Sequence, residues 1–241
     1  MLLRLICLLS LGLFSLSVCA DGRYSSKVYI PNQYQPDDSL ISFTSQLDKL
    51  AEKKDLSMLL TRVDKRFYIS RDFGGMFNPE HSHEQNFINI FSLDDSKLRE
   101  EFRGSGWAMF KKLLNERSFQ KVKGDICSPA NVLPVKDNLP DEFWLSWGYV
   151  AGEDVFVRSE PNLQAEPIDS LSYEVIEPVE GMQGDRVKGL NGQGLWIKVN
   201  TPRGKQGYMY STYFDNFLKA QICYRQVSGQ WKIIGFVGGG D

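Results

Sequence analysis

The chain has 241 residues, with 28 lysines and arginines against 30 aspartates and glutamates, so its formal net charge is −2. A balance this close to neutral excludes the concentrated basic surface of nucleic-acid-binding proteins, and the chain has no polybasic segment for an anionic membrane surface. The length suffices for one large or two small domains with cores of their own.

Residues 1–20, MLLRLICLLSLGLFSLSVCA, predict a secretory signal peptide. One positive charge at Arg4 precedes an apolar run, and small residues end the segment, which is the pattern of a leader cleaved after Ala20. The alternative is a lipoprotein anchored through Cys19, although Val18 is bulkier than the residue expected before a lipidated cysteine. No second apolar stretch approaches the ~20 residues that span a bilayer. We therefore predict an exported protein, periplasmic or secreted, without stable membrane insertion.

Two cysteines, Cys127 and Cys223, remain after the leader is removed, and an oxidising compartment would allow them to pair. The segment GDICSPA around Cys127 resembles the Cys-Ser of cell-wall peptidases of the NlpC type. Those enzymes place their histidine after the cysteine, whereas the only histidines here, His81 and His83, precede it. We therefore expect either a Cys127–Cys223 disulfide or two buried thiols, and no cysteine nucleophile.

Residues 21–37 are polar, contain two prolines and have no period, so we predict a flexible arm. Residues 38–148 predict a helical α+β domain. Apolar residues recur every three or four positions in several segments, which predicts helices over 39–50, 55–63, 83–93 and 94–116, the last broken near Gly104 and Gly106. Alternating apolar residues predict strands over 65–71 and 119–127.

The sequence pattern differs over residues 149–216, where short segments of alternating apolar and polar residues are separated by Gly, Pro and Asn. This spacing predicts a small all-β barrel. One set of alternate positions would fill its interior: Val155, Val157, Ile197, Val199 and Met209. The other set would point outward: Phe156, Trp196, Lys198, Tyr208 and Tyr210.

Five short pieces of this region occur in a recognisable order: VFVRSEP (155–161), LSY (171–173), WIKV (196–199), GYM (207–209) and STYF (211–214). Together they resemble the bacterial Src-homology-3-like (SH3-like) domain. The resemblance implies a small barrel, and its outward aromatic residues suggest a groove that receives a peptide or glycan. The sequence leaves open whether these aromatics are exposed or cover the neighbouring domain.

Residues 217–241 contain a hairpin, AQICYRQ and WKIIGFV joined by VSGQ. We assign Trp231, Ile233 and Val237 to one face of its second strand and Ile234 and Phe236 to the other, so both faces require burial. A lone hairpin is marginally stable in water. The hairpin therefore completes the N-terminal α+β domain, and the barrel is an insertion. A disulfide between the two cysteines would join the strands on either side of the insertion.

The composite of 38–148 and the hairpin resembles helix-wrapped sheets of the nuclear-transport-factor-like or cystatin-like kind, with GQWKI (229–233) in the final strand. The order of modules also resembles exported bacterial proteins that carry an SH3-like domain before a similar hairpin.

Catalytic motifs are missing from the sequence: there is no Gly-x-Ser-x-Gly, no Ser-x-x-Lys and no phosphate-binding loop. Two histidines are too few for a zinc site. We predict no cofactor, no metal and no enzymatic activity, but a binding protein that recognises cell-wall peptide or a protein partner. The predicted aromatic surface consists of Tyr173, Trp196, Tyr208, Tyr210 and Tyr213. Arg158 and Lys198 would bind carboxylates, although Arg158 is equally suited to bracing a turn carbonyl.

Two other functions stay open. A small-molecule enzyme or carrier would use a cavity in the α+β domain, with Asp64 or Asp72 as the base, and it requires a closed apolar pocket that holds a carboxylate of raised pKa. A periplasmic inhibitor or immunity protein is the third possibility, which the sequence does not separate from the first.

Overall fold

The computed structural model describes residues 27–70, 78–135, 139–141, 143–179, 186–192 and 194–239. The fold is mixed α+β, as predicted, and it contains several sheets and few helices. The predicted signal peptide lies outside the described residues. Within these residues, no helix is both long and apolar enough to cross a membrane.

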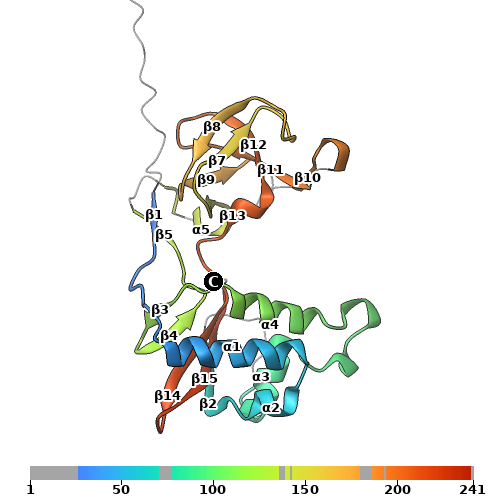
Figure 1. The fold of residues 1–241 in the computed structure, drawn as a ribbon, viewed down its shortest axis with the longest axis vertical. Coiled ribbons are helices and arrows are strands. Elements are labelled where there is room, and N and C mark those ends of the chain that lie inside the picture. Colours follow the sequence, from blue (N-terminus) through green and yellow to red (C-terminus); the bar gives the residue numbers. More distant parts are fainter. Residues whose placement is uncertain are drawn as a thin grey trace, which may run out of the picture.

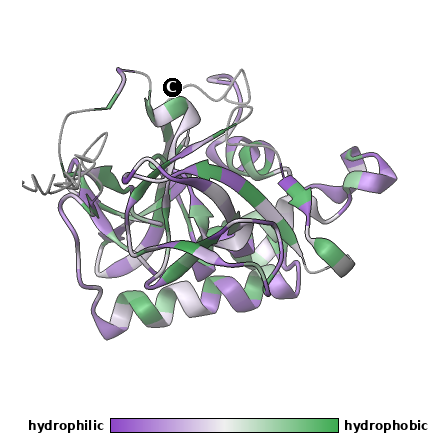
Figure 2. Ribbon diagram, turned by 90° about the horizontal axis from the view of Figure 1, so that it is seen from above, coloured by the Kyte–Doolittle hydropathy of each residue, from purple (hydrophilic) through white to green (hydrophobic). Residues whose placement is uncertain are grey.

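N-capping side chains mark the starts of three helices, and amphipathic patterns run along the helices. Asp37, Asp55 and Ser82 accept hydrogen bonds from the backbone at the starts of α1, α2 and α3. Hydrophobic and hydrophilic residues alternate in stripes along the helices (Figure 2). The bounds of the helices are α1 (Asp38–Glu52), α2 (Leu56–Leu60), α3 (His83–Phe91), α4 (Ser105–Asn115) and α5 (Phe143–Ser146).

The region predicted as two helices over 94–116 differs from that prediction. Its first half forms two 3-10 turns, Asp95–Lys97 and Glu100–Phe102. Gly104, with a φ of 82°, precedes α4, whereas Gly106 lies inside this helix. Gly106 therefore serves the packing of α4 and does not break it.

A five-stranded sheet forms one end of the molecule (Figure 1). Its strands, in spatial order, are β2 (Val63–Ser70), β15 (Gln230–Val237), β14 (Gln221–Val227), β4 (Asp125–Ser128) and β3 (Gln120–Val122). Only the β15–β2 pair is parallel. The C-terminal hairpin thus lies between β2 and β4, which both precede the eight-stranded sheet in the chain, and its two faces contribute to separate apolar clusters.

The two faces of this sheet have separate cores. Alternate residues of β14, Ile222 and Tyr224, pack with α1, α3 and α4, whereas Cys223 between them belongs to a smaller cluster on the other face. The predicted faces of β15 are wrong at two positions, because Phe236 joins Ile233 on the helix face and Val237 joins Ile234 on the other. The reason is a β-bulge at Ile234, which adds one residue and reverses the alternation after it.

An eight-stranded sheet forms the other end of the molecule (Figure 1). Seven strands pair in the order β13-β6-β9-β11-β12-β7-β8, and β10 pairs with β11. The strands are β6 (Gly148–Val150), β7 (Val155–Arg158), β8 (Pro167–Leu171), β9 (Val175–Pro178), β10 (Arg186–Lys188), β11 (Leu195–Asn200), β12 (Gln206–Tyr210) and β13 (Phe214–Asp215). In the described residues the end strands β13 and β8 do not pair, so the sheet is not a closed barrel. The predicted interior residues are all in its core: Val155, Val157, Ile197, Val199 and Met209.

The arm hydrogen-bonds to both sheets from Lys27 onward. Its strand β1 (Val28–Tyr29) pairs with β5 (Leu133–Pro134), and the amide of Val28 donates to the carbonyl of Tyr173 at 3.2 Å. Farther along, Gln33 bridges to Gln120 at the edge of the five-stranded sheet. The described part of the arm thus covers the junction between the sheets.

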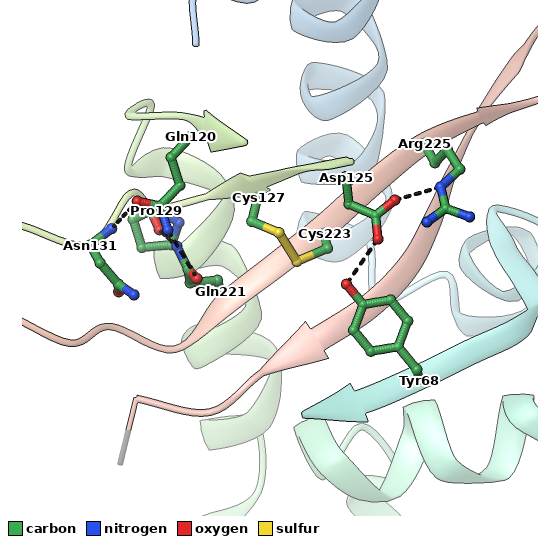
Figure 3. The surroundings of a disulfide bond; sticks show 9 residues. All are labelled: Tyr68, Gln120, Asp125, Cys127, Pro129, Asn131, Gln221, Cys223 and Arg225. Carbon is green, nitrogen blue, oxygen red and sulfur yellow. Dashed lines mark hydrogen bonds and ion pairs between the residues drawn. A yellow bond between two sulfur atoms is a disulfide. The ribbon is translucent and has the colours of Figure 1, made fainter. Parts of the chain in front are cut away.

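Two chain segments cross between the sheets side by side. The amide of Val132 donates to the carbonyl of Phe217 at 3.0 Å, and the side chain of Gln221 donates to the carbonyl of Pro129 at 2.6 Å. Gln120 accepts from the amide of Asn131 at 3.1 Å, which completes a buried network at this crossing (Figure 3). The segment that forms the eight-stranded sheet therefore leaves and rejoins the five-stranded sheet at one place.

Candidate functional site

The predicted aromatic and basic residues gather on the outward face of β11 and β12. Trp196 lies opposite Tyr210 and Lys198 opposite Tyr208, and Tyr208 also lies opposite Arg158 on β7. Side chains directly opposite across paired strands lie on the same face of a sheet. These five residues therefore share the face that points away from the core of the eight-stranded sheet.

A hollow of about 160 Å³ lies on this face. It is lined by Glu153, Asp154, Val155, Phe156, Arg158, Leu163, Trp196, Tyr210 and Tyr213. Trp196 is only 1% exposed and meets Tyr210 edge to face, with ring centroids 5.5 Å apart. Leu163 is 56%, Phe156 48% and Tyr213 42% exposed, so these three side chains provide accessible apolar surface in the hollow.

Four of the seven residues predicted to bind a ligand line the hollow: Arg158, Trp196, Tyr210 and Tyr213. Lys198 and Tyr208 lie farther along the same face, with the lysine Nζ 5.9 Å from the tyrosine ring centroid. Tyr173 is not part of this hollow and lines a different pocket. The predicted surface is therefore divided between two places.

Several residues of the hollow were not predicted from the sequence. Phe156 was predicted to point outward, since it alternates with the buried Val155 and Val157, but it was not assigned to the site. Leu163 follows no period, because it lies in the loop between β7 and β8, so nothing in the local sequence indicates it. The acidic residues Glu153 and Asp154 precede β7, and no sequence pattern assigned them to the site.

The charges around the hollow differ from those predicted. Arg158 donates to the carbonyl of Ala165 at 2.7 Å and lies over the Phe156 ring, 5.2 Å from its centroid. Arg158 thus braces a turn, which is the alternative that the sequence left open. Glu153 and Asp154 are exposed, and among the described residues neither carboxylate has an ion-pair partner. The hollow is therefore aromatic, with Arg158 in its wall and two acidic residues at its rim.

A second, larger pocket of about 430 Å³ lies between the arm and the junction. Tyr173 and Tyr29 are about half exposed there. Lys219 at this pocket has a side chain that is 12% exposed, and it pairs with Glu116 at 3.0 Å and with Asp215. Burial would lower the pKa of Lys219, but the neighbouring Asp215 outweighs this effect and the pKa is raised. Because these charges satisfy one another, the accessible surface of the pocket is mainly apolar and aromatic.

The α+β core offers little support for a catalytic carboxylate. Asp64 accepts hydrogen bonds from the side chain and the backbone amide of Arg66, and the side-chain bond is the main reason why the pKa of Asp64 is lowered. A general base of the predicted kind needs a raised pKa. Asp72 lies outside the described residues. In the described ranges, no group of three or more His, Cys, Asp or Glu side chains could hold a metal ion.

Arg203 joins two buried carboxylates at the edge of the eight-stranded sheet, 2.7 Å from Asp169 and 3.5 Å from Glu174. Burial would raise the pKa of Asp169, but hydrogen bonds from Arg203 and Thr201 outweigh burial and lower the pKa. A carboxyl with a lowered pKa stabilises the fold above the pKa of the unfolded state, and this contribution is lost as the pH falls through the folded-state pKa.

We therefore expect Arg203→Gln to lower the free energy of unfolding by about 1–2 kcal/mol near neutral pH, because Arg203 itself is half exposed. The loss should shrink at a pH below the pKa of Asp169, where the carboxyl is protonated in both proteins. Urea unfolding of both proteins, near neutral pH and below the pKa of Asp169, measures this loss of stability. Lys97→Gln, which removes an exposed pair with Asp94, is the control. An equal loss at both pH values would contradict this electrostatic account.

Comparisons with protein-family models, with curated proteins and with solved structures each found no match. We therefore infer function from the geometry of the chain itself.

Proposed function

We propose that this chain is an exported, non-catalytic binding protein in which residues 149–216 form an SH3-like domain that recognises a peptide segment of the cell wall or of a protein partner. The observation that carries the proposal is the hollow between Phe156, Tyr210 and Tyr213. Its volume of about 160 Å³ is below the ~300–1,000 Å³ of typical small-molecule pockets. A hollow of this size suits one side chain of a longer ligand.

The exposed rings support this reading. Phe156 and Tyr213 are large and have few rotatable bonds, so they supply contact area at a low entropic cost. The neighbouring outward residues Lys198 and Tyr208 extend the face along the strands, as a chain-like ligand would require. The Cys127–Cys223 disulfide is consistent with an oxidising extracellular compartment.

The test is co-sedimentation of residues 21–241 with purified peptidoglycan sacculi. We expect the double variant Phe156→Ser/Tyr213→Ser to bind at least about tenfold more weakly, because aromatic anchors at the centre of an interface carry most of its affinity. Both side chains are exposed, so their replacement should change stability little. Phe102→Ser, which removes an exposed ring from the 3-10 turn Glu100–Phe102, outside the hollow, is the matched control and should bind like the unmodified protein.

Two results would count against parts of the proposal. If the double variant binds as well as the control, the hollow is not the binding site. If no form of the protein binds sacculi, the cell wall is not the ligand. A photoreactive phenylalanine analogue placed at position 156 should then cross-link to a protein of the cell envelope, and the absence of any cross-link would reject the proposed peptide site.

A further inference from the structure

A pocket of about 420 Å³ lies on the face of the five-stranded sheet opposite the helices. It is lined by Tyr68, Ser70, Val122, Lys123, Asp125, Arg225 and Val237. Three of these, Tyr68, Val122 and Val237, pack with the disulfide cluster and not with the helix core. The pocket is therefore separate from the hollow of the proposed peptide site.

Tyr68 gives the pocket an apolar wall by reaching across the sheet. Its strand β2 pairs with β15, and a Cβ atom at Gly235 of β15 would lie 2.4 Å from the tyrosine ring, so only glycine leaves room for the ring. Beyond β15 and β14, the hydroxyl donates to Asp125 on β4 at 3.0 Å (Figure 3). Burial and the nearby Asp125 raise the pKa of Tyr68, so the hydroxyl stays a donor.

Asp125 is neutralised within the protein. It is 3% exposed, and its two carboxylate oxygens accept from Tyr68 and from Nε of Arg225. A ligand in the pocket therefore does not meet an open carboxylate at this position.

Two cationic groups remain available at the pocket. The Nη atoms of Arg225 donate no hydrogen bond to any described residue, and the side chain is 44% exposed (Figure 3). Lys123 is exposed, lies in the turn between β3 and β4, and has no ion pair with a described residue. Since Asp125 offsets Arg225, the charge of Lys123 makes the pocket cationic overall.

We propose that this pocket binds a carboxylate carried on an apolar group, as at the C-terminus of a peptide that ends in an apolar residue. The Nη edge of Arg225 matches the planar geometry of a carboxylate, and Lys123 adds a second charge. The apolar group packs against Val122, Tyr68 and Val237. The volume of about 420 Å³ lies within the ~300–1,000 Å³ range of ligand pockets.

The disulfide positions this site. Cys127 and Cys223 lie directly opposite each other on β4 and β14, the strands that carry Asp125 and Arg225. The cross-link holds these strands in register (Figure 3). A site held in its bound geometry before the ligand arrives loses less entropy on binding.

The experiment is a titration of residues 21–241, followed by backbone amide NMR shifts, with N-acetylphenylalanine and with its neutral amide. We expect the acid to bind at least about fivefold more tightly than the amide, as two charge-assisted contacts allow. The shifted amides should be those of Val122, Lys123, Arg225 and Val237. Octanoate is a third probe: weaker binding than the acetylated amino acid indicates a peptide terminus, and equal or tighter binding indicates a free carboxylic acid.

Three variants test the charges. Lys123→Asn removes the cation and keeps a residue that tolerates the positive φ of 48°. Arg225→Lys keeps a positive charge beside Asp125 but removes the Nη edge. Each should reduce the preference for the acid by about twofold to fivefold. Lys121→Gln lies in the same hairpin but opposite Ile126, on the helix face, and should leave the preference unchanged.

Several outcomes would overturn the inference. These are equal binding of acid and amide, shifts confined to other residues, no shift with any probe, or an unchanged preference in Lys123→Asn. That variant alone decides the matter if Arg225→Lys fails to fold, because Lys123 is an exposed turn residue. Binding of sacculi through the Phe156 hollow is measured separately, so either proposal can be contradicted without affecting the other.

Discussion

Replacing Cys127 and Cys223 together with alanine is expected to lower the free energy of unfolding by about 3–5 kcal/mol. The disulfide joins residues 96 positions apart, so in the unfolded chain it closes a loop that contains the whole eight-stranded sheet. A loop of ~100 residues corresponds to about 4.7 kcal/mol in the chain-entropy model. The lower end of our range applies if residues 149–216 stay folded while the five-stranded sheet unfolds, because a folded insertion shortens the effective loop.

Urea unfolding monitored by tryptophan fluorescence would measure this loss. The unmodified protein under reducing conditions is the matched control, and it should approach the stability of the double variant. Both cysteines are fully buried, so alanine also removes some packing. A change below about 1 kcal/mol would show that the disulfide adds little to a register that the β14–β4 hydrogen bonds already determine.

Gly106→Ala is the second substitution with a large expected effect. Helix propensity alone favours alanine over glycine inside a helix by about 1 kcal/mol. The structure predicts the opposite sign, because the added Cβ would lie 2.1 Å from the carbonyl oxygen of Phe91 and 2.4 Å from that of Ser92. Both atoms belong to the backbone at the end of α3, which cannot move as a flexible side chain does. We expect a loss of about 2–3 kcal/mol in the free energy of unfolding.

Thermal and urea unfolding would decide between the two signs. Met109→Ala, on the exposed face of the same helix, is the control and should change stability by less than about 0.5 kcal/mol. A more stable Gly106→Ala protein would mean that α3 and α4 can separate at this contact without cost, and it would contradict the close approach seen in the structure.

Local patterns predicted the helices well. The helix over 83–93 follows from apolar residues at helical spacing and from Ser82 as cap, and the structure begins α3 at the next residue, His83. Capping and i, i+3 or i, i+4 contacts involve residues close in sequence, so the sequence is informative about them. The helical reading failed over 94–103, where the 3-10 turns contain no fully buried apolar side chain to support a helix.

The position of the hairpin was also predictable. Apolar residues on both faces of WKIIGFV required cover from both sides, and β15 lies between β2 and β14 with a core on each face. The side chains assigned to each face were not all correct. A β-bulge leaves little trace in an apolar run, since every residue around Ile234 is compatible with either face.

The candidate sites were predictable only in part. Alternation along the strands determined which side chains point outward, and it identified Trp196 and Tyr210 as neighbours of the hollow. Alternation does not indicate how deeply a ring is buried, so the nearly complete burial of Trp196 was missed.

The sequence by itself determined the α+β class, the start of α3 and the inward residues of the eight-stranded sheet, whereas it left open whether Cys127 and Cys223 form a disulfide or two buried thiols. Each feature that the sequence determined follows from a local period or from the need to bury apolar surface. Only the tertiary structure decided that Tyr68 crosses Gly235 to reach Asp125, that Gly106 contacts the end of α3, and that Phe156 and Tyr213 share a hollow. The physical reason is that these contacts join residues distant in the chain, and ångström-scale differences in how packed elements approach one another decide whether such residues meet.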